Sequence, residues 1–318
     1  MNVVILDANT LPVPVLRPSW ASAWAARSTT RADDVVDALS DAAIAITNKV
    51  PIRREDLEHL PRLRFICVAA TGYDCVDIEA CRERGIVVSN VPGYSAQSVS
   101  EWVIASIFAL RRSLPAYQVL AREAWARSPS FCVHGAPIRD IAGATLGIFG
   151  RGAIGQATGR LAGALGMNVL YAERRDRVST RDGFVPFYDV LRAADVLSLH
   201  CPLTEQTRNL IGRKELETLK PGALLVNSAR GALIDSYALI DALASGKLAG
   251  AALDVLPAEP PDSDDPVLNS SHPNLIVTPH ISWAATSGSI RLNEGISANL
   301  NAFHAGKPVN LVPLVSQG

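Results

Sequence analysis

Short apolar runs rich in β-branched residues alternate along the chain with longer stretches in which apolar residues recur at helical spacing. Four of these runs form a first series, at residues 3–6, 43–46, 64–68 and 86–90; six form a second series, at 146–150, 168–172, 195–200, 223–229, 250–255 and 275–280. Continuous apolar runs between helical segments are typical of parallel strands covered by helices on both faces. The pattern predicts an α/β fold with two doubly wound parallel sheets.

Helical spacing also marks the two connections between the series. Residues 98–117 predict one long helix that leaves the first series, and helical periodicity after His280 predicts a return. We therefore expect a discontinuous first domain, residues 1–97 plus 285–318, with a second domain, residues 98–284, inserted in it. A length of 318 residues suits two domains better than one.

Composition and charge narrow the class of protein. Apolar residues make up 48% of the chain, enough for large cores, and a net charge of −1 leaves no basic surface for nucleic acid. No apolar run approaches the ~20 residues that span a bilayer, and the first residues show no basic leader, so we expect a cytoplasmic protein without membrane contact. The five cysteines lack metal-binding spacing, which favours structural thiols and no metal site.

A cluster of glycines lies between the first two strands of the second series. Residues 146–173 place a strand, then Gly150, Gly152 and Gly155, then a helix of small residues and a second strand. The first glycine permits a tight turn, the second lets the backbone approach a pyrophosphate, and the third lets the helix pack close to the strand. The helix N-terminus adds N–H groups and a positive dipole. This context predicts a dinucleotide site over an ordinary glycine-rich turn.

The second of these strands ends in one acid followed by two arginines. Glu173 lies 18 residues after the third glycine, close to the roughly 20 at which such folds place the acid that binds the adenosine ribose. Its carboxylate would accept hydrogen bonds from the ribose hydroxyls of NAD and repel the 2′-phosphate of NADP. Arg174 and Arg175 act in the opposite direction, since a guanidinium binds phosphate well. The sequence favours NAD and leaves NADP open.

Three further residues suit hydride transfer to a ketone, which requires a proton donor and a cation for the substrate. Arg230, Glu259 and His280 each follow a strand of the second series, at the edge where doubly wound sheets bind ligands. They are separated by 29 and 21 residues, about one helix-and-strand repeat each. Singly, each is more readily a surface cation, a solvated acid or a structural histidine. Together they are the predicted catalytic set.

Five motifs in a fixed order extend this picture: GRGAIG (150–155), LHCPLT (199–204), NSARG (227–231), LDVLPAEP (253–260) and TPHISWA (278–284). Over nearly its whole length the chain resembles the D-isomer-specific 2-hydroxyacid dehydrogenases. WARSPSFC (125–132) and Trp283 are similar to the glycerate dehydrogenase or hydroxypyruvate reductase group. The resemblance implies a Rossmann cofactor domain inserted in a flavodoxin-like substrate domain.

The resemblance also implies a role for each member of the catalytic set. His280 is the general acid when a 2-keto acid is reduced and the base in the reverse direction. Glu259 hydrogen-bonds the imidazole, orients it and favours its protonated form. Arg230 holds the carboxylate and keto oxygen of the substrate.

The resemblance implies further contacts. The substrate also meets Trp283 and the backbone N–H groups of Thr71 and Gly72. The implied cofactor-binding residues are Gly150, Arg151, Gly152, Ile154, Gly155, Glu173, Arg174, His200, Cys201, Pro202, Thr207, Ala229 and Asp254.

The expected activity is reduction of a small 2-keto acid, hydroxypyruvate or glyoxylate, by NAD or NADP in reduced form. The resemblance suggests a homodimer joined through the apolar segment 98–110. A rival interpretation is a corepressor-like protein that senses NAD and has weak or no activity, because related proteins of that kind share the fold. His134, near the segment shared with the glycerate dehydrogenase group, is a further candidate.

Overall fold

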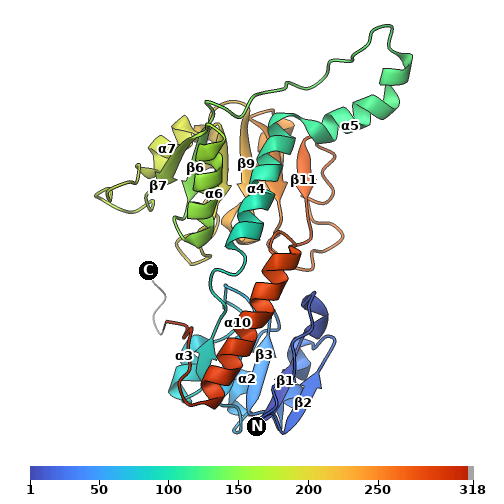
Figure 1. Cartoon of the computed structure of the whole chain (residues 1–318). Coiled ribbons are helices and arrows are strands. Elements are labelled where there is room, and N and C mark those ends of the chain that lie inside the picture. Colours follow the sequence, from blue (N-terminus) through green and yellow to red (C-terminus); the bar gives the residue numbers. More distant parts are fainter. Residues whose placement is uncertain (314–318) are drawn as a thin grey trace. The chain divides into compact units, whose positions relative to one another are not determined.

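The structure of the protein, a computed structural model, describes residues 1–313 (Figure 1). The chain forms two compact units. Unit 1 comprises Met1–Ser95 and the described residues from Ala284 onward, and unit 2 comprises Ala96–Trp283. Residues 314–318, which end the expected first domain, lie outside the described residues. Within residues 1–313, no helix has the length and apolar character needed to cross a bilayer.

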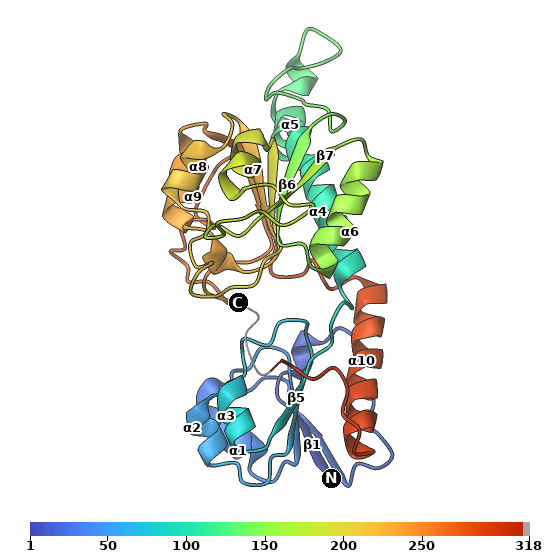
Figure 2. The ribbon, with the colours of Figure 1, turned by 90° about the vertical axis from the view of Figure 1, so that its left-hand side faces the viewer.

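Unit 1 is built on a five-stranded parallel sheet of order β2-β1-β3-β4-β5. Its strands are β1 (Asn2–Ile5), β2 (Ala23–Ala26), β3 (Ile44–Thr47), β4 (Phe65–Val68) and β5 (Val87–Ser89). One face is covered by α1 (Val35–Leu39), α2 (Arg54–Glu58) and α3 (Ile78–Glu83), and the other by α10 (Thr286–His304) (Figure 2). This strand order is the one found in flavodoxin-like sheets.

Helix α10 joins the C-terminal segment to the core of unit 1. The ring of Phe303 stacks on that of Phe65 in β4, with centroids 4.3 Å apart. The buried Asn299 donates from Nδ2 to the Asn90 carbonyl oxygen at 2.8 Å. Burial of both an aromatic face and a satisfied amide explains why this distant segment folds with the N-terminal residues.

Unit 2 is built on a six-stranded parallel sheet of order β11-β10-β9-β8-β6-β7. Its strands are β6 (Thr145–Phe149), β7 (Asn168–Ala172), β8 (Val196–Leu199), β9 (Ala223–Asn227), β10 (Leu248–Leu253) and β11 (Leu275–Val277). One face is covered by α4 (Ala96–Arg111) and α6 (Ala153–Ala164), and the other by α7 (Phe187–Ala193), α8 (Arg213–Thr218) and α9 (Ser236–Ala244) (Figure 2).

The strand order of unit 2 reverses at β6. From β6 the chain passes to β7 on one side, and β8 then lies on the other side of β6. Doubly wound sheets bind ligands at the carboxyl ends of the strands beside such a reversal. The prediction of two parallel-sheet α/β domains is confirmed, and the reversal locates the edge at which a ligand is expected.

The expectation of one long helix over residues 98–117 is wrong. Two helices occupy this region, α4 and α5 (Leu114–Glu123), and they are separated at Ser113, which has a left-handed φ of 51°. The Ser113 hydroxyl donates to the Pro137 carbonyl oxygen at 2.9 Å. Pro115 lies in the first turn of α5, where its missing N–H is harmless, so the chain turns between two helices that the apolar spacing alone had joined.

Strand β2 was not predicted. It pairs with β1 at the edge of the unit 1 sheet, and three of its four residues are exposed. Its residues, AWAA, are apolar but include no β-branched side chain, so the β-branched signal used for the other strands is absent from it.

Candidate functional site

The glycine loop follows β6 at the strand-order reversal, and two of its glycines are required by the protein's own packing. Gly150 has φ of 105°, and a Cβ there would lie 2.6 Å from the backbone nitrogen of Cys201. A Cβ on Gly155 would lie 2.0 Å from the Gly150 carbonyl oxygen. Neither position accepts a side chain, because α6 and the end of β8 pack directly on this turn.

Gly152 differs from its neighbours in a way that fits a dinucleotide. A Cβ at this position would meet no atom of the described residues within 4 Å, so protein packing does not require the glycine. Gly152 is the N-cap of α6, and its helix start has no side-chain cap. The first N–H groups of α6 therefore face an open surface where a pyrophosphate can approach closely.

Arg151 connects the glycine loop to the turn after β7. Its guanidinium carbon lies 4.7 Å from the ring centroid of Tyr171 and 5.3 Å from that of Phe184. Its Nη1 donates to the Gly183 carbonyl oxygen at 3.4 Å. Ile154 is partly buried in the first turn of α6. The loop and the turn therefore form one continuous surface at the carboxyl edge of β6 and β7.

Glu173 lies at the end of β7 but is engaged within the protein. Its side chain is 2% exposed, and Oε1 accepts hydrogen bonds from the Arg174 backbone N–H at 2.8 Å and Arg181 Nη2 at 2.7 Å. Oε2 accepts from the Arg181 backbone N–H at 3.0 Å and Arg181 Nε at 2.9 Å. The hydrogen bond from the Arg181 side chain is the main cause that lowers the pKa of Glu173 to about 2. The sequence showed the acid but not its partner.

The two arginines after Glu173 point to different surroundings. Arg174 is exposed. Arg175 donates to the Leu210 carbonyl oxygen, lies 3.6 Å from the Glu215 carboxylate and covers the ring of Phe187 with centroid distance 5.1 Å. Arg175 therefore packs within unit 2, whereas Arg174 is exposed. The sequence alone does not distinguish the two adjacent arginines.

The residues after β8 form a compact loop beside Gly150. The His200 ring shares a hydrogen bond of 2.9 Å with the Ser198 hydroxyl, and burial lowers the pKa of His200 to about 4, so its ring is neutral at neutral pH. Burial likewise raises the pKa of the Cys201 thiol to about 11. Thr207 donates from its hydroxyl to the Pro202 carbonyl oxygen at 2.7 Å, which closes the loop. This edge presents neutral side chains.

His280 and Glu259 are in direct contact at the carboxyl edge of the same sheet. His280 Nδ1 lies 2.7 Å from Glu259 Oε2, with the two side chains 22% and 35% exposed. Glu259 Oε1 accepts from the Leu256 backbone N–H at 3.1 Å, which orients the carboxylate. With Nδ1 engaged, Nε2 of His280 is the ring atom left to exchange a proton with a ligand.

Asp254 holds the loop that carries His280. It is 1% exposed; Oδ1 accepts from the Thr278 hydroxyl at 2.5 Å and the Ile281 N–H at 2.9 Å, and Oδ2 from the Ser282 N–H at 2.9 Å. The Asp254 carbonyl oxygen accepts from the His280 N–H at 2.8 Å. These bonds support the φ of 55° at His280. The resemblance implied a contact of Asp254 with the cofactor; the observed use of its carboxylate is to order this loop.

Arg230 lies beside the loop that carries Glu259. Its Nη1 donates to the Ala229 carbonyl oxygen at 2.8 Å, and its own carbonyl oxygen accepts from Asn227 Nδ2 at 2.8 Å. A Cβ on Gly231 would lie 2.0 Å from the Leu256 carbonyl carbon, so this glycine allows the two segments to touch. Sequence reasoning missed Gly231 as a site residue, although its place after Arg230 is a local signal.

The remaining predicted site residues lie in two places. Trp283 donates from Nε1 to the His280 carbonyl oxygen at 2.9 Å, which places it in the loop of unit 2 that carries His280. Thr71 and Gly72 belong to unit 1, where the Thr71 hydroxyl donates to the Val91 carbonyl oxygen at 3.1 Å. His134 lies 3.5 Å from the Cys132 sulfur in the segment after α5. Within residues 1–313, no group of three or more His, Cys, Asp or Glu side chains could hold a metal.

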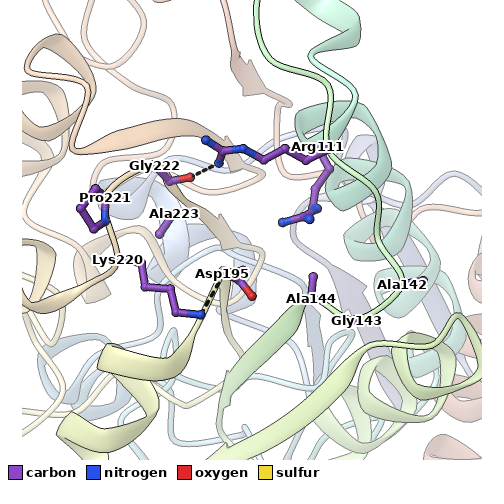
Figure 3. A pocket seen from close by; sticks show the side chains of 10 residues that line it. Arg111, Ala142, Gly143, Ala144, Asp195, Lys220, Pro221, Gly222 and Ala223 are labelled. Atoms are coloured by element: carbon purple, nitrogen blue, oxygen red, sulfur yellow. Dashed lines mark hydrogen bonds and ion pairs between the residues drawn. The ribbon is translucent and has the colours of Figure 1, made fainter.

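A cavity of about 430 Å³ in unit 2 does not coincide with these residues. It lies at the opposite, amino edge of the sheet, and charged groups line it (Figure 3). Lys220 Nζ lies 3.0 Å from Asp195 Oδ1, and Arg139 donates to the Gly222 carbonyl oxygen at 2.6 Å. These charges already have partners within the protein, so the carboxyl edge of the sheet is the better candidate site.

Comparisons with known proteins identify the family of this chain. Residues 104–282 match the family described as D-isomer specific 2-hydroxyacid dehydrogenase, NAD binding domain. The chain is 42% identical over 313 residues to a glycerate dehydrogenase of Methylorubrum extorquens, covering 98% of each protein. It is 39% identical over 289 residues to a hydroxypyruvate reductase of Blautia hydrogenotrophica, covering 90% of this chain and 89% of that protein.

A solved structure extends the likeness to the whole fold. An acyclic imino acid reductase in complex with NADPH and D-Arg has a TM-score of 0.84 and 28% identity, covering 98% of this chain and 100% of that one. Together with the family match, these likenesses establish an NAD(P)-dependent oxidoreductase that acts on 2-hydroxy acids. The chain therefore belongs to the D-isomer-specific 2-hydroxyacid dehydrogenase family.

Proposed function

We propose that the enzyme reduces a small 2-keto acid, hydroxypyruvate or glyoxylate, to the D-2-hydroxy acid with a reduced nicotinamide dinucleotide. The observation that carries this proposal is the 2.7 Å contact of His280 with Glu259, at the same sheet edge as the glycine loop. A histidine oriented by a carboxylate is a proton donor that works near neutral pH. The glycerate dehydrogenase and hydroxypyruvate reductase names of the two relatives favour these substrates.

The roles of the residues follow from their positions. The cofactor, when bound at the glycine loop, supplies the hydride. His280 Nε2 gives a proton to the carbonyl oxygen of the substrate, and Glu259 stabilises the protonated ring through Nδ1. Arg230 binds the substrate carboxylate as a bidentate donor. Asp254 keeps the His280 loop in place.

Different units carry the proposed dinucleotide-binding and substrate-binding residues. Unit 2 holds the dinucleotide through the glycine loop, the turn after β7, the loop after β8 and Ala229. Unit 1 is the proposed substrate domain, and Thr71 and Gly72 are its proposed substrate-binding residues. Trp283, hydrogen-bonded to the His280 carbonyl oxygen, contacts the carbon chain of the substrate.

The replacement Glu259→Gln tests the carboxylate's role. Gln keeps the shape of the side chain and removes the negative charge that His280 Nδ1 contacts at 2.7 Å. We expect kcat/KM for keto-acid reduction to fall by about 30-fold, the value of a hydrogen bond to a charged group. Steady-state kinetics of both enzymes measure this. Glu217→Gln, at an exposed position of α8, is the charge-matched control; kcat/KM of Glu259→Gln equal to that of the wild type would contradict the role.

Steady-state assays test the proposed substrates. Hydroxypyruvate, glyoxylate, pyruvate and phosphohydroxypyruvate are each offered with NADH and with NADPH. We expect hydroxypyruvate or glyoxylate to have the largest kcat/KM, because the relatives named above are a glycerate dehydrogenase and a hydroxypyruvate reductase. Inactivity on all four substrates would contradict the proposal and favour a corepressor-like role. None of the relatives named above supports that role.

We also propose a cytoplasmic homodimer, for which α5 and the segment after it provide the surface. In the segment 98–110 expected to join the dimer, Val99, Val103, Ile107 and Leu110 pack in the core of unit 2 instead. Helix α5 has no buried residue and extends away from the sheet of unit 2 (Figure 1). Leu114, Val119, Trp125 and Phe131 are exposed there. All five cysteines are free, as suits a reducing compartment. Sedimentation equilibrium is expected to give twice the chain mass; a monomer at micromolar concentration would refute the dimer.

A further inference from the structure

The Glu173 carboxylate has no capacity left for a ribose. Two carboxylate oxygens offer about four lone-pair sites, and four N–H donors occupy them: the Arg174 backbone N–H and the backbone N–H, Nε and Nη2 of Arg181. The side chain is 2% exposed, so ribose hydroxyls could reach it only if Arg181 left. The usual reason to expect NAD from an acid at the end of β7 is therefore missing in this protein.

The ion pair of Arg181 with Glu173, here called the Arg181 clamp, belongs to a packed turn and is not a loose surface contact. Arg181 also covers the ring of Phe184, with its guanidinium carbon 4.1 Å from the centroid, and Arg151 of the glycine loop lies over the same ring at 5.3 Å. The Glu173 backbone N–H donates to the Val185 carbonyl oxygen at 2.8 Å. The turn from Glu173 to Val185 is thus closed at both ends and packed against the glycine loop.

The turn from Glu173 to Val185 carries four arginines and three acids (Glu173, Asp176 and Asp182), so it keeps a net excess of one positive charge. Arg181 neutralises Glu173, and Arg177 lies 3.9 Å from the same carboxylate. Arg175 is engaged with Glu215 and Leu210. Arg174 directly follows Glu173; it is exposed, and among the described residues its guanidinium has no hydrogen bond or ion pair. Arg174 is therefore the cation left at the end of β7 once Glu173 is paired with Arg181.

We propose that this enzyme recognises the 2′-position of the adenosine ribose with Arg174, and that Glu173 is a positioning residue whose ion pair with Arg181 lets the site accept a 2′-phosphate. The site then binds NADP(H) at least as well as NAD(H). A guanidinium binds phosphate through two parallel N–H bonds, and a carboxylate already paired with Arg181 no longer repels it. The inference deepens the proposed function by naming its cofactor, but it depends only on nucleotide binding.

Binding of nucleotide fragments tests this without turnover. Calorimetric titration compares 2′,5′-ADP with 5′-AMP, which differ by the 2′-phosphate alone. We expect the wild type to bind 2′,5′-ADP more tightly than 5′-AMP. In Arg174→Ala the affinity for 2′,5′-ADP should fall by about tenfold, the value of one charged hydrogen bond, while the affinity for 5′-AMP changes little. Arg213→Ala, which removes an exposed cation of α8, should leave both affinities unchanged. Tighter binding of AMP by the wild type would overturn the proposal.

The clamp is tested by Arg181→Ala and by Arg181→Ala combined with Glu173→Gln. The single change frees a carboxylate beside the ribose, so affinity for 2′,5′-ADP should fall by about tenfold while AMP binding is kept or improves. The double change removes that charge and should restore 2′,5′-ADP binding towards the wild-type value. Without restoration, Arg181 itself binds the phosphate and the role of Glu173 is wrong.

The fragment titrations also separate this proposal from the proposed reaction. A protein that prefers 2′,5′-ADP but reduces none of the four keto acids would refute the substrate assignment and leave Arg174 in its role. Conversely, fast reduction of hydroxypyruvate with binding that favours AMP would refute the role of Arg174 and leave the reaction standing.

Discussion

His280→Ala is expected to lower kcat/KM for keto-acid reduction by about 10³-fold, the range of a lost general acid. Nε2 of His280 is the ring atom available to a substrate because Nδ1 is held by Glu259 at 2.7 Å. Nucleotide binding should hardly change, since the glycine loop and the turn after β7 do not include His280. Steady-state kinetics and fragment titration measure the two effects separately.

A second variant, His280→Asn, separates loss of the proton donor from disruption of the loop that carries His280. His280 has φ of 55°, a left-handed conformation that Asn adopts more readily than Ala. His280→Asn should therefore keep the loop that Asp254 organises and still lose the proton donor. The control is His59→Ala, at an exposed position after α2 in unit 1. Turnover within tenfold of wild type in His280→Asn would rule out His280 as the acid.

Gly155→Ala is expected to have the largest effect on stability. Its new Cβ would lie 2.0 Å from the Gly150 carbonyl oxygen, a distance that no side-chain rotation relieves because both atoms are fixed by the backbone. Helix α6 must move away from β6, which we expect to cost roughly 3 kcal/mol of the free energy of unfolding. The helix N-terminus moves with it, so affinity for 2′,5′-ADP should fall by more than tenfold.

The same helix provides the matched control. Gly163 is also a glycine of α6, but it is exposed and a Cβ there meets no described atom within 4 Å. Gly163→Ala should raise stability by up to about 1 kcal/mol, because Ala has the higher helix propensity. Urea unfolding and fragment titration of both variants measure the contrast. Equal stability of the two would show that α6 does not depend on close contact at Gly155.

Several features of the site were predictable because their signals are local. Gly150, Gly152 and Gly155 stand between a strand and a helix, and this spacing predicts a phosphate-binding turn whatever the rest of the chain does. His280 and Glu259 follow strands that run in parallel, so they had to emerge at one edge of the sheet. The 2.7 Å contact between them is a consequence of strand order and loop length.

Other features depend on contacts that no local pattern contains. The helix expected over residues 98–117 breaks at Ser113, whose hydroxyl bonds to Pro137, and β2 is defined by pairing with β1 and not by its own composition. Gly231 matters because Leu256, 25 residues later, packs against it. In each case the partner is remote along the chain.

The amino-acid sequence by itself determined two parallel sheets, the glycine loop and the residues placed after each strand, because periodicity and spacing encode these directly. Only the tertiary structure decided what those residues contact. Glu173 shows the difference best: its spacing is that of a ribose-binding acid, yet Arg181, eight residues later, occupies both of its oxygens. A side chain's partner is chosen by the path of the turn and by burial, and neither can be deduced from the spacing of two residues.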